Sequence, residues 1–264
     1  MRFDCKVNRS FMRILIPFLC AVAIALPTKA RELDVVVGWN KPPYVISQEH
    51  SGFEIDLVRA ILAEMGHTLS PIYVPFGRTA RLLKDSTVDI GLTQSAAHDI
   101  DDSVLSDPYI IYQNVVVTKT QNNFVISEVS NLKGKRVIGF QTAQSVLGEE
   151  FKQALALEPM YMEMARQDRQ VDMLMLDHVD AIVLDRNIFN YFRSKNSAYD
   201  KEKTVFHELF PISIYRAAIP NPKLRAEFNA TLHRFIADGR YQLLLDEYQL
   251  DNLLHKLPKA LAKL

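Results

Sequence analysis

The residue types that most often carry catalysis do not occur here in the spacings that catalysis needs. Seven histidines are spread along the chain, at positions 50, 67, 98, 178, 207, 233 and 255, with no pair three or four residues apart. Helical metal sites use that spacing. The chain also lacks the GxSxG pattern, the P-loop and a GxGxxG pattern after a strand. The sequence therefore argues against these enzyme classes, and we expect no metal and no cofactor.

A single carboxylate stands where a ligand could reach it. Asp185 directly follows residues 181–184 (AIVL), an apolar run typical of a buried strand. The carboxyl ends of parallel strands border the crevice in which α/β proteins bind ligands. The alternative is a salt bridge to Arg186 or another neighbour. We expect Asp185 to contact a ligand.

Residues 140–145 (FQTAQS) form a second candidate, because they join a predicted strand to a predicted helix. Free backbone N–H groups at such a junction can seat an anion. Thr142, Gln144 and Ser145 supply the polar side chains. Ser145 could instead serve only as the N-cap of the helix.

The elements that position these residues follow from hydrophobic periodicity. In the first part of the chain the pattern predicts strands at 33–37, 69–74 and 88–92 and helices at 53–65 and 77–84. Alternating strands and helices imply parallel strands with right-handed crossovers. The first part is therefore predicted to be an α/β domain.

A second block follows a long extended run at 109–118 (YIIYQNVVVT). The pattern predicts strands at 136–140 and 181–184, helices at 146–155, 168–176, 224–237 and 241–248, and a second extended run at 212–219. Two extended crossings around an α/β block suggest two lobes joined by two strands. The apolar tail at 251–264 is expected to pack on the first lobe; docking of a partner is the alternative.

Length and charge fit this organisation. A chain of 264 residues accommodates two domains. Its 31 basic residues equal its 31 acidic ones, so no overall basic field favours nucleic acid. We expect no nucleic-acid partner and a monomer.

Residues 1–30 are predicted to be a secretory signal peptide. Four basic residues precede an apolar run at 14–26, which is too short to span a bilayer comfortably, since that takes about 20 residues. Cleavage is placed after Ala30, with Met12 as an alternative start; a short anchor or a buried helix is the other interpretation. Both cysteines, Cys5 and Cys20, lie in this segment, so the exported chain would have no thiol nucleophile and a net charge of −4.

Seven short motifs in order resemble one protein family. They are residues 52–57 (GFEIDL), 88–90 (VDI), 105–109 (LSDPY), 132–137 (LKGKRV), 179–181 (VDA), 221–224 (NPKL) and 238–241 (DGRY). Together they resemble the family 3 extracellular solute-binding proteins, whose best-known members deliver polar amino acids to ABC importers. The resemblance implies a type II periplasmic-binding fold: two α/β lobes, a two-strand hinge and a ligand cleft. Lobe one is expected at 31–117 plus 216–264, and lobe two at 118–215.

The resemblance also implies ligand-contacting residues. On lobe one these are Trp39 and Tyr44 in the loop after the first strand, Phe76 as a second aromatic wall, and Thr93 and Gln94 after the third strand. On lobe two they are Thr142, Gln144 and Asp185, with Asp185 at the position that usually receives a ligand ammonium group. Tyr44 could instead pack as core under its two preceding prolines.

One departure concerns the carboxylate clamp, an arginine that amino-acid binders of the family usually carry after the third strand. No arginine occurs between Arg81 and Arg136. Arg78 is the expected substitute, and its alternative is a solvated helix residue. His98 could titrate near neutral pH if it lines the cleft. Loss of the clamp with retention of Asp185 suggests a cationic or amine-bearing ligand.

The resulting hypothesis is a periplasmic protein that binds a small polar solute, closes on it and presents it to a membrane permease of an ABC importer. A ligand sensor for a membrane receptor or kinase is the first alternative. A dehydratase-like enzyme is the second, with Asp185 or Glu149 as general acid. The missing cation and the absence of catalytic motifs argue against the enzyme.

Overall fold

The computed structural model describes residues 1, 30–75, 78–95, 98, 100–259 and 261. The expected signal peptide, residues 1–30, therefore lies almost wholly outside the described residues. Within the described part of the chain, no helix has both the length and the apolarity needed to cross a bilayer.

The first sheet has five strands in the order β2-β1-β3-β10-β4. Its strands are β1 (Glu32–Gly38), β2 (Thr68–Val74), β3 (Ile90–Gln94), β4 (Leu105–Tyr112) and β10 (Ser213–Ala218). Strand β1 is parallel to β2 and β3, whereas β10 is antiparallel to β3 and β4. The predicted parallel strands of the first part are confirmed.

Four helices pack with this sheet: α1 (Phe53–Glu64), α2 (Thr79–Lys84), α7 (Pro222–Ala237) and α8 (Arg240–Glu247). Helix α1 buries Ile55, Val58 and Ile61 on one side, as its apolar spacing predicts. Gly52 precedes α1 at a φ of 110°, and a Cβ there would lie 2.5 Å from the carbonyl oxygen of Tyr44. Glycine is thus required where the loop after β1 packs against the start of α1.

The second sheet also has five strands, in the order β7-β6-β8-β5-β9, with β6 parallel to β7 and β8, and β5 antiparallel to β8 and β9. Its strands are β5 (Asn114–Lys119), β6 (Val137–Phe140), β7 (Tyr161–Met164), β8 (Ala181–Asp185) and β9 (Thr204–His207), and its helices are α3 (Ala143–Val146), α4 (Glu149–Leu155), α5 (Gln167–Met175) and α6 (Arg186–Ser194). The helix predicted at 146–155 is two helices, because Gly148 between them has a φ of 95°.

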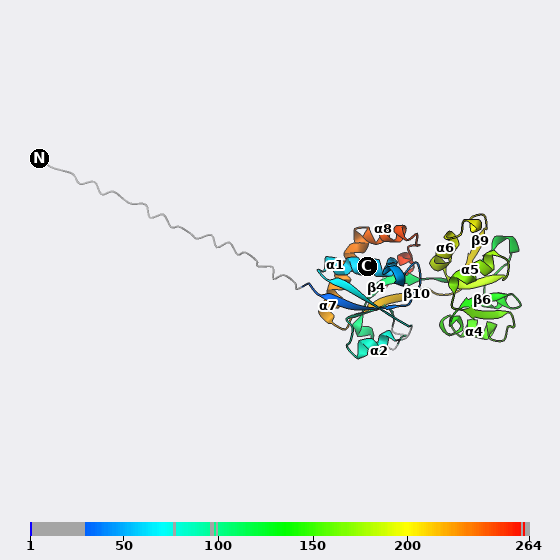
Figure 1. Cartoon of the computed structure of the whole chain (residues 1–264), viewed down its shortest axis with the longest axis horizontal. Coiled ribbons are helices and arrows are strands. Elements are labelled where there is room, and N and C mark those ends of the chain that lie inside the picture. Colours follow the sequence, from blue (N-terminus) through cyan, green and yellow to red (C-terminus); the bar gives the residue numbers. More distant parts are fainter. Residues whose placement is uncertain (2–29, 76–77, 96–97, 99, 260, 262–264) are drawn as a thin grey trace.

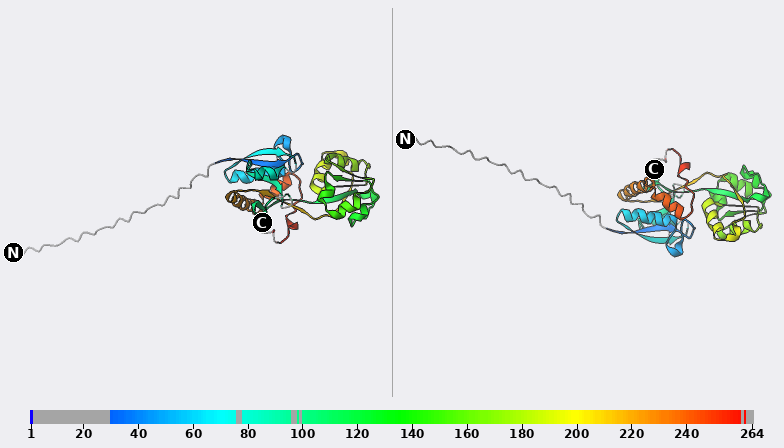
Figure 2. Two further views of the ribbon diagram at one scale, coloured as in Figure 1. Left: turned by 90° about the horizontal axis from the view of Figure 1, so that it is seen from below. Right: turned by 90° about the horizontal axis from the view of Figure 1, so that it is seen from above.

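The chain passes between the sheets twice. The predicted extended run at 109–118 is two strands that break at Gln113, with β4 in the first sheet and β5 in the second. The return runs from β9 to β10. Figures 1 and 2 show the two sheets in separate lobes joined by these crossings. The lobe boundaries at 117/118 and 215/216 stay a prediction; the sheets themselves change at Gln113 and between His207 and Ser213.

The C-terminal tail packs on the first lobe, as predicted. Leu253 and Leu257 are buried in a cluster with Ile111 of β4, next to Ile214 of β10. The tail forms a short 3₁₀ turn at Leu254–Lys256 within its described residues.

Candidate functional site between the two lobes

A cavity of about 460 Å³ lies between the lobes, at the carboxyl ends of β6 and β8. Its lining comes from both lobes: Lys41, Tyr112 and Tyr215 from the first, and Asn114, Phe140, Gln141, Thr142, Val146, Ala165, Gln167, Asp185 and Ile188 from the second. Cavities that bind small molecules measure roughly 300–1,000 Å³, so this one has the size for a small solute.

Lys41 lines this cavity and also a second one of about 220 Å³ on the first lobe. Its loop is held by a backbone hydrogen bond from Lys41 to the carbonyl of Val45, at 2.8 Å. The ammonium nitrogen lies 4.5 Å from the centroid of the Tyr112 ring. Burial lowers the pKa of Lys41, and the carboxylates of Glu54 and Asp185 oppose that shift. Lys41 thus places a cation where the two cavities meet.

Asp185 ends β8 and is also the N-cap of α6. Its Oδ1 accepts hydrogen bonds from the backbone N–H groups of Asn187 and Ile188, at 3.0 and 3.1 Å, and from the Tyr44 hydroxyl at 2.9 Å. Its Oδ2 accepts one from the backbone N–H of Gln113, at 2.9 Å. Burial raises the pKa of Asp185, and these hydrogen bonds oppose the rise. Both oxygens are therefore engaged by the chain itself, and contact with a ligand ammonium stays a prediction.

Tyr44 lies in the contact between the lobes and is 1% exposed. Its ring stacks on Tyr112 with centroids 4.2 Å apart. Its hydroxyl donates to Asp185 and accepts a hydrogen bond from the side-chain amide of Asn187, at 3.1 Å. Burial, followed by the Asp185 charge, raises the pKa of Tyr44 well above its ordinary value. This placement fits the core alternative, and Tyr44 is not among the residues that line the cavity between the lobes.

Thr93 and Gln94 end β3 and border the smaller cavity. Thr93 has a φ of 55°, which is rare for a β-branched residue. Its backbone N–H donates to the Tyr109 hydroxyl at 2.9 Å, and its own hydroxyl donates to the buried Glu54 at 2.6 Å. These bonds hold the strained backbone in place. The Gln94 amide donates to the carbonyl of Leu92 at 2.6 Å.

The expected anion seat of lobe two already holds a carboxylate of this chain. Glu163 accepts hydrogen bonds from the backbone N–H groups of Thr142 and Gln144, at 2.7 and 2.8 Å, and from the Tyr161 hydroxyl at 3.0 Å. Thr142 borders the cavity, whereas Gln144 is not among its lining residues. Ser145 is exposed within α3 and is not the N-cap, a position that Thr142 occupies.

Trp39 and Arg78 are not among the residues that line the two cavities. Trp39 is 64% exposed. Arg78 is exposed at the start of α2 and lines neither cavity. Phe76 falls outside the described residues, and both Trp39 and Arg78 stay unconfirmed as ligand contacts.

His98 borders the smaller cavity and stacks on Tyr215 with ring centroids 6.1 Å apart. Burial lowers the pKa of His98, and the nearby Lys41 ammonium lowers it further. The described charged groups at the two cavities are thus Lys41, the titratable His98 and the fully engaged Asp185.

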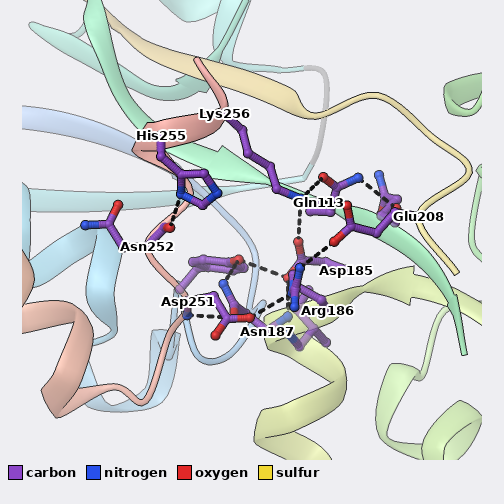
Figure 3. A network of polar contacts seen from close by, with 12 residues as sticks. Gln113, Asp185, Arg186, Asn187, Glu208, Asp251, Asn252, His255 and Lys256 are labelled. Carbon is purple, nitrogen blue, oxygen red and sulfur yellow. Dashed lines mark hydrogen bonds and ion pairs between the residues drawn. The ribbon is translucent and has the colours of Figure 1, made fainter. Parts of the chain in front are cut away.

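A polar network joins the C-terminal segment to the second lobe (Figure 3). The Arg186 guanidinium pairs with Asp251 at 2.7 Å and with Glu208 at 2.8 Å. Lys256 pairs with Glu208 at 2.7 Å and donates to the side-chain oxygen of Gln113 at 3.2 Å. Arg186 thus pairs with these other carboxylates and not with Asp185, whereas a pairing of Asp185 with another neighbour stays an untested alternative.

The comparison with protein families bears on this arrangement. The model of the bacterial extracellular solute-binding proteins, family 3, matches residues 33–251, which include both sheets and the cavity between them. The chain belongs to this family. No match was found among curated protein sequences.

Solved structures agree with the fold of this solute-binding protein. An ancestral arginine-binding protein bound to arginine is 22% identical, with a TM-score of 0.63 over 82% of this chain and 97% of its own. A histidine kinase sensor domain similar to periplasmic binding proteins is 18% identical, with a TM-score of 0.64 over 84% and 99%. The amino acid ABC transporter substrate-binding protein AbpA from Streptococcus pneumoniae, bound to L-arginine, is 16% identical, with a TM-score of 0.60 over 82% and 94%. The chain has the predicted type II periplasmic-binding fold.

Most of the cavity lining was not predicted from the sequence, and the residues missed include Lys41, Tyr112 and Tyr215. Lys41 was detectable, because the loop after β1 borders the crevice of an α/β lobe. The two tyrosines sit in the crossing strands, and nothing in an extended apolar run marks which side chains face a cavity.

Proposed function

We propose that this solute-binding protein captures a small polar solute in the cavity between its lobes and presents it to the membrane subunits of an ABC importer. The observation that carries the proposal is the origin of the cavity wall: both lobes contribute residues to it. A solute that contacts Lys41 and Tyr215 on one lobe and Phe140 and Gln141 on the other stabilises the arrangement in which the lobes are close. A membrane partner that recognises this arrangement then receives only loaded protein.

The cellular location belongs to the same proposal. A basic segment, an apolar run at 14–26 and a small residue at Ala30 support export through a cleaved signal peptide, and the family consists of extracellular proteins. We place the protein in the periplasm as a monomer, where an importer can meet it.

Melting temperature in the presence of candidate solutes tests the binding function. A ligand at 100 times its dissociation constant adds about 2.7 kcal/mol to the free energy of unfolding. Val146→Trp fills the cavity from α3, where Val146 is 48% exposed and borders it. Leu157→Trp is the control, since Leu157 is 95% exposed and outside the cavity.

Solutes should raise the melting temperature of the wild type and of Leu157→Trp, and binding should weaken at least tenfold in Val146→Trp. Equal binding by Val146→Trp would place the ligand elsewhere and contradict the proposal.

Sensing of the same solute for a membrane kinase is the second candidate, and the similar kinase sensor domain favours it. Uptake of the solute by cells distinguishes the two. Deletion of the protein abolishes uptake in the transport role, and leaves uptake intact but removes a transcriptional response in the sensing role.

The geometry gives the dehydratase alternative little support. Both carboxylate oxygens of Asp185 accept hydrogen bonds from groups of the chain itself. Glu149 is exposed on α4 and is not among the residues that line the cavity. The family is one of binding proteins.

A further inference from the structure

Lys41 is a cation without a carboxylate partner at the centre of the site. It lines both cavities, and among the described residues none places a carboxylate within ion-pair distance of its ammonium. Its ammonium nitrogen lies over the face of Tyr112, 4.5 Å from the ring centroid. By contrast, Lys256 in the C-terminal segment pairs with Glu208 at 2.7 Å. The Lys41 ammonium is partly buried and lies against an aromatic ring, with no anion of the chain beside it. Because a buried charge is costly without a partner, an anion from outside the chain would be bound favourably there.

Among the described residues that line the two cavities, none offers a cationic ligand a free carboxylate. Asp185 is the one acidic residue among the described lining, and its four hydrogen bonds come from the chain itself. Glu163 is committed to the backbone of Thr142 and Gln144. An incoming ammonium would meet Lys41 instead, at the cost of like-charge repulsion.

The uncharged part of the wall has an apolar and aromatic portion beside four polar side chains, those of Asn114, Gln141, Thr142 and Gln167. Tyr112, Tyr215 and Phe140 line the cavity with Val146 and Ile188. The rings of Tyr112 and Tyr215 pack edge to face at 5.0 Å, which forms a continuous aromatic wall beside Lys41.

We propose that Lys41 selects the solute, and that the solute is a small organic acid whose carboxylate pairs with the Lys41 ammonium while its apolar body lies against Tyr112, Tyr215 and Phe140. This inference rests on the proposed solute binding and replaces the amine-bearing ligand that the sequence suggested. Lys41 supplies from the loop after β1 the cation that the absent arginine would have supplied from beyond β3.

Calorimetric titration with matched probes tests the inference. The probe set consists of phenylacetate, hexanoate and succinate, the corresponding neutral amides, the amines 2-phenylethylamine and hexylamine, and the amino acids arginine and glutamine. Lys41→Met keeps the alkyl stem and removes the charge, and Lys41→Arg keeps the charge. Lys135→Met is the matched control, because Lys135 also lies over an aromatic ring, that of Phe124 at 4.3 Å, outside the cavities.

At least one of the acids should bind ten times more tightly than its amide, and Lys41→Met should lose that tenfold difference. Lys41→Arg should retain most of the preference, and Lys135→Met should bind as the wild type does. Unliganded melting temperatures identify a variant that merely fails to fold, and the Lys41→Arg result still decides the question in that case.

Tighter binding of an amine, an amide or an amino acid than of any acid would overturn the inference and leave solute binding intact. Unchanged acid binding by Lys41→Met would do the same. Absence of binding by every probe would overturn the inference; the proposed function fails as well only if solute-dependent stabilisation is also absent from the wider melting screen.

Discussion

The Tyr44 hydroxyl donates a 2.9 Å hydrogen bond to the Asp185 carboxylate across 141 positions of sequence. It links the loop after β1 of the first sheet to the end of β8 in the second. Asp185 in turn caps α6 and accepts from Gln113, at the point where the chain crosses between the sheets. One carboxylate thus fixes the loop that carries Lys41, the crossing strand and the floor of the cavity.

Tyr44→Phe should lower the free energy of unfolding by about 2 kcal/mol, because a hydrogen bond to a buried charged group is worth about 1.5–3 kcal/mol. The side-chain amide of Asn187 loses its acceptor as well. Tyr241→Phe is the control, since its buried hydroxyl donates to the Tyr109 carbonyl within lobe one. That neutral bond should cost about 1 kcal/mol. Urea unfolding measures the loss in free energy of unfolding for both variants. Equal losses would mean that the hydrogen bond from Tyr44 to Asp185 stabilises the fold no more than a neutral one.

His98 should make the free energy of unfolding depend on pH. Burial and the Lys41 ammonium hold the pKa of His98 below its ordinary 6.5, so the unfolded chain binds more protons between those two values. Stability therefore falls as the pH drops from 6.5 through the lowered pKa. The free energy of unfolding of the wild type minus that of His98→Gln, measured at each pH, isolates the contribution of His98. It removes the contribution of His207, because burial lowers the pKa of His207 as well. A difference that is constant from pH 7.5 to 4.5 would contradict the burial of His98.

Glu163→Gln should destabilise the protein by about 1 kcal/mol, because a charged acceptor binds backbone N–H groups about twice as strongly as a neutral one. Its carboxylate holds the N–H groups of Thr142 and Gln144 at the start of α3. Glu247→Gln on α8 is the exposed control and should change stability by less than about 0.5 kcal/mol. Chemical unfolding compares them. Equal effects would mean that Glu163 is an ordinary surface acid.

Trp39 should report closing of the lobes, because it is the single tryptophan of the chain and is 64% exposed. If it lies over the ligand, as the resemblance implies, its fluorescence emission should move to shorter wavelength when solute is added. Trp39→Phe should then weaken binding by roughly tenfold or less, in keeping with about 1 kcal/mol for an aromatic contact. An unshifted spectrum with unchanged affinity in Trp39→Phe would make Trp39 a surface residue.

Much of the architecture was predictable because it depends on local patterns. The apolar spacing of α1 and α7 and the buried runs of β1 and β8 each follow from residues a few positions apart. The two extended crossings were visible for the same reason. Seven ordered motifs then identified the family, which the family comparison confirms.

The site was less predictable because its contacts join distant segments. The bond between Glu163 and the start of α3 depends on the register of β6 against β7, in which Phe140 lies opposite Met164. The placement of Lys41 depends on the tight contact between Gly52 and Tyr44. Neither register nor close packing of this kind can be seen in residue types along one chain.

A solute is expected to close the two lobes around the cavity that they share. Small-angle X-ray scattering of the purified protein, with and without a solute that raises its melting temperature, tests it most directly. The radius of gyration should fall on addition of the solute in the wild type and in Leu157→Trp, and should stay constant in Val146→Trp. A solute that binds the wild type tightly and leaves its radius of gyration unchanged would show that binding does not close the lobes.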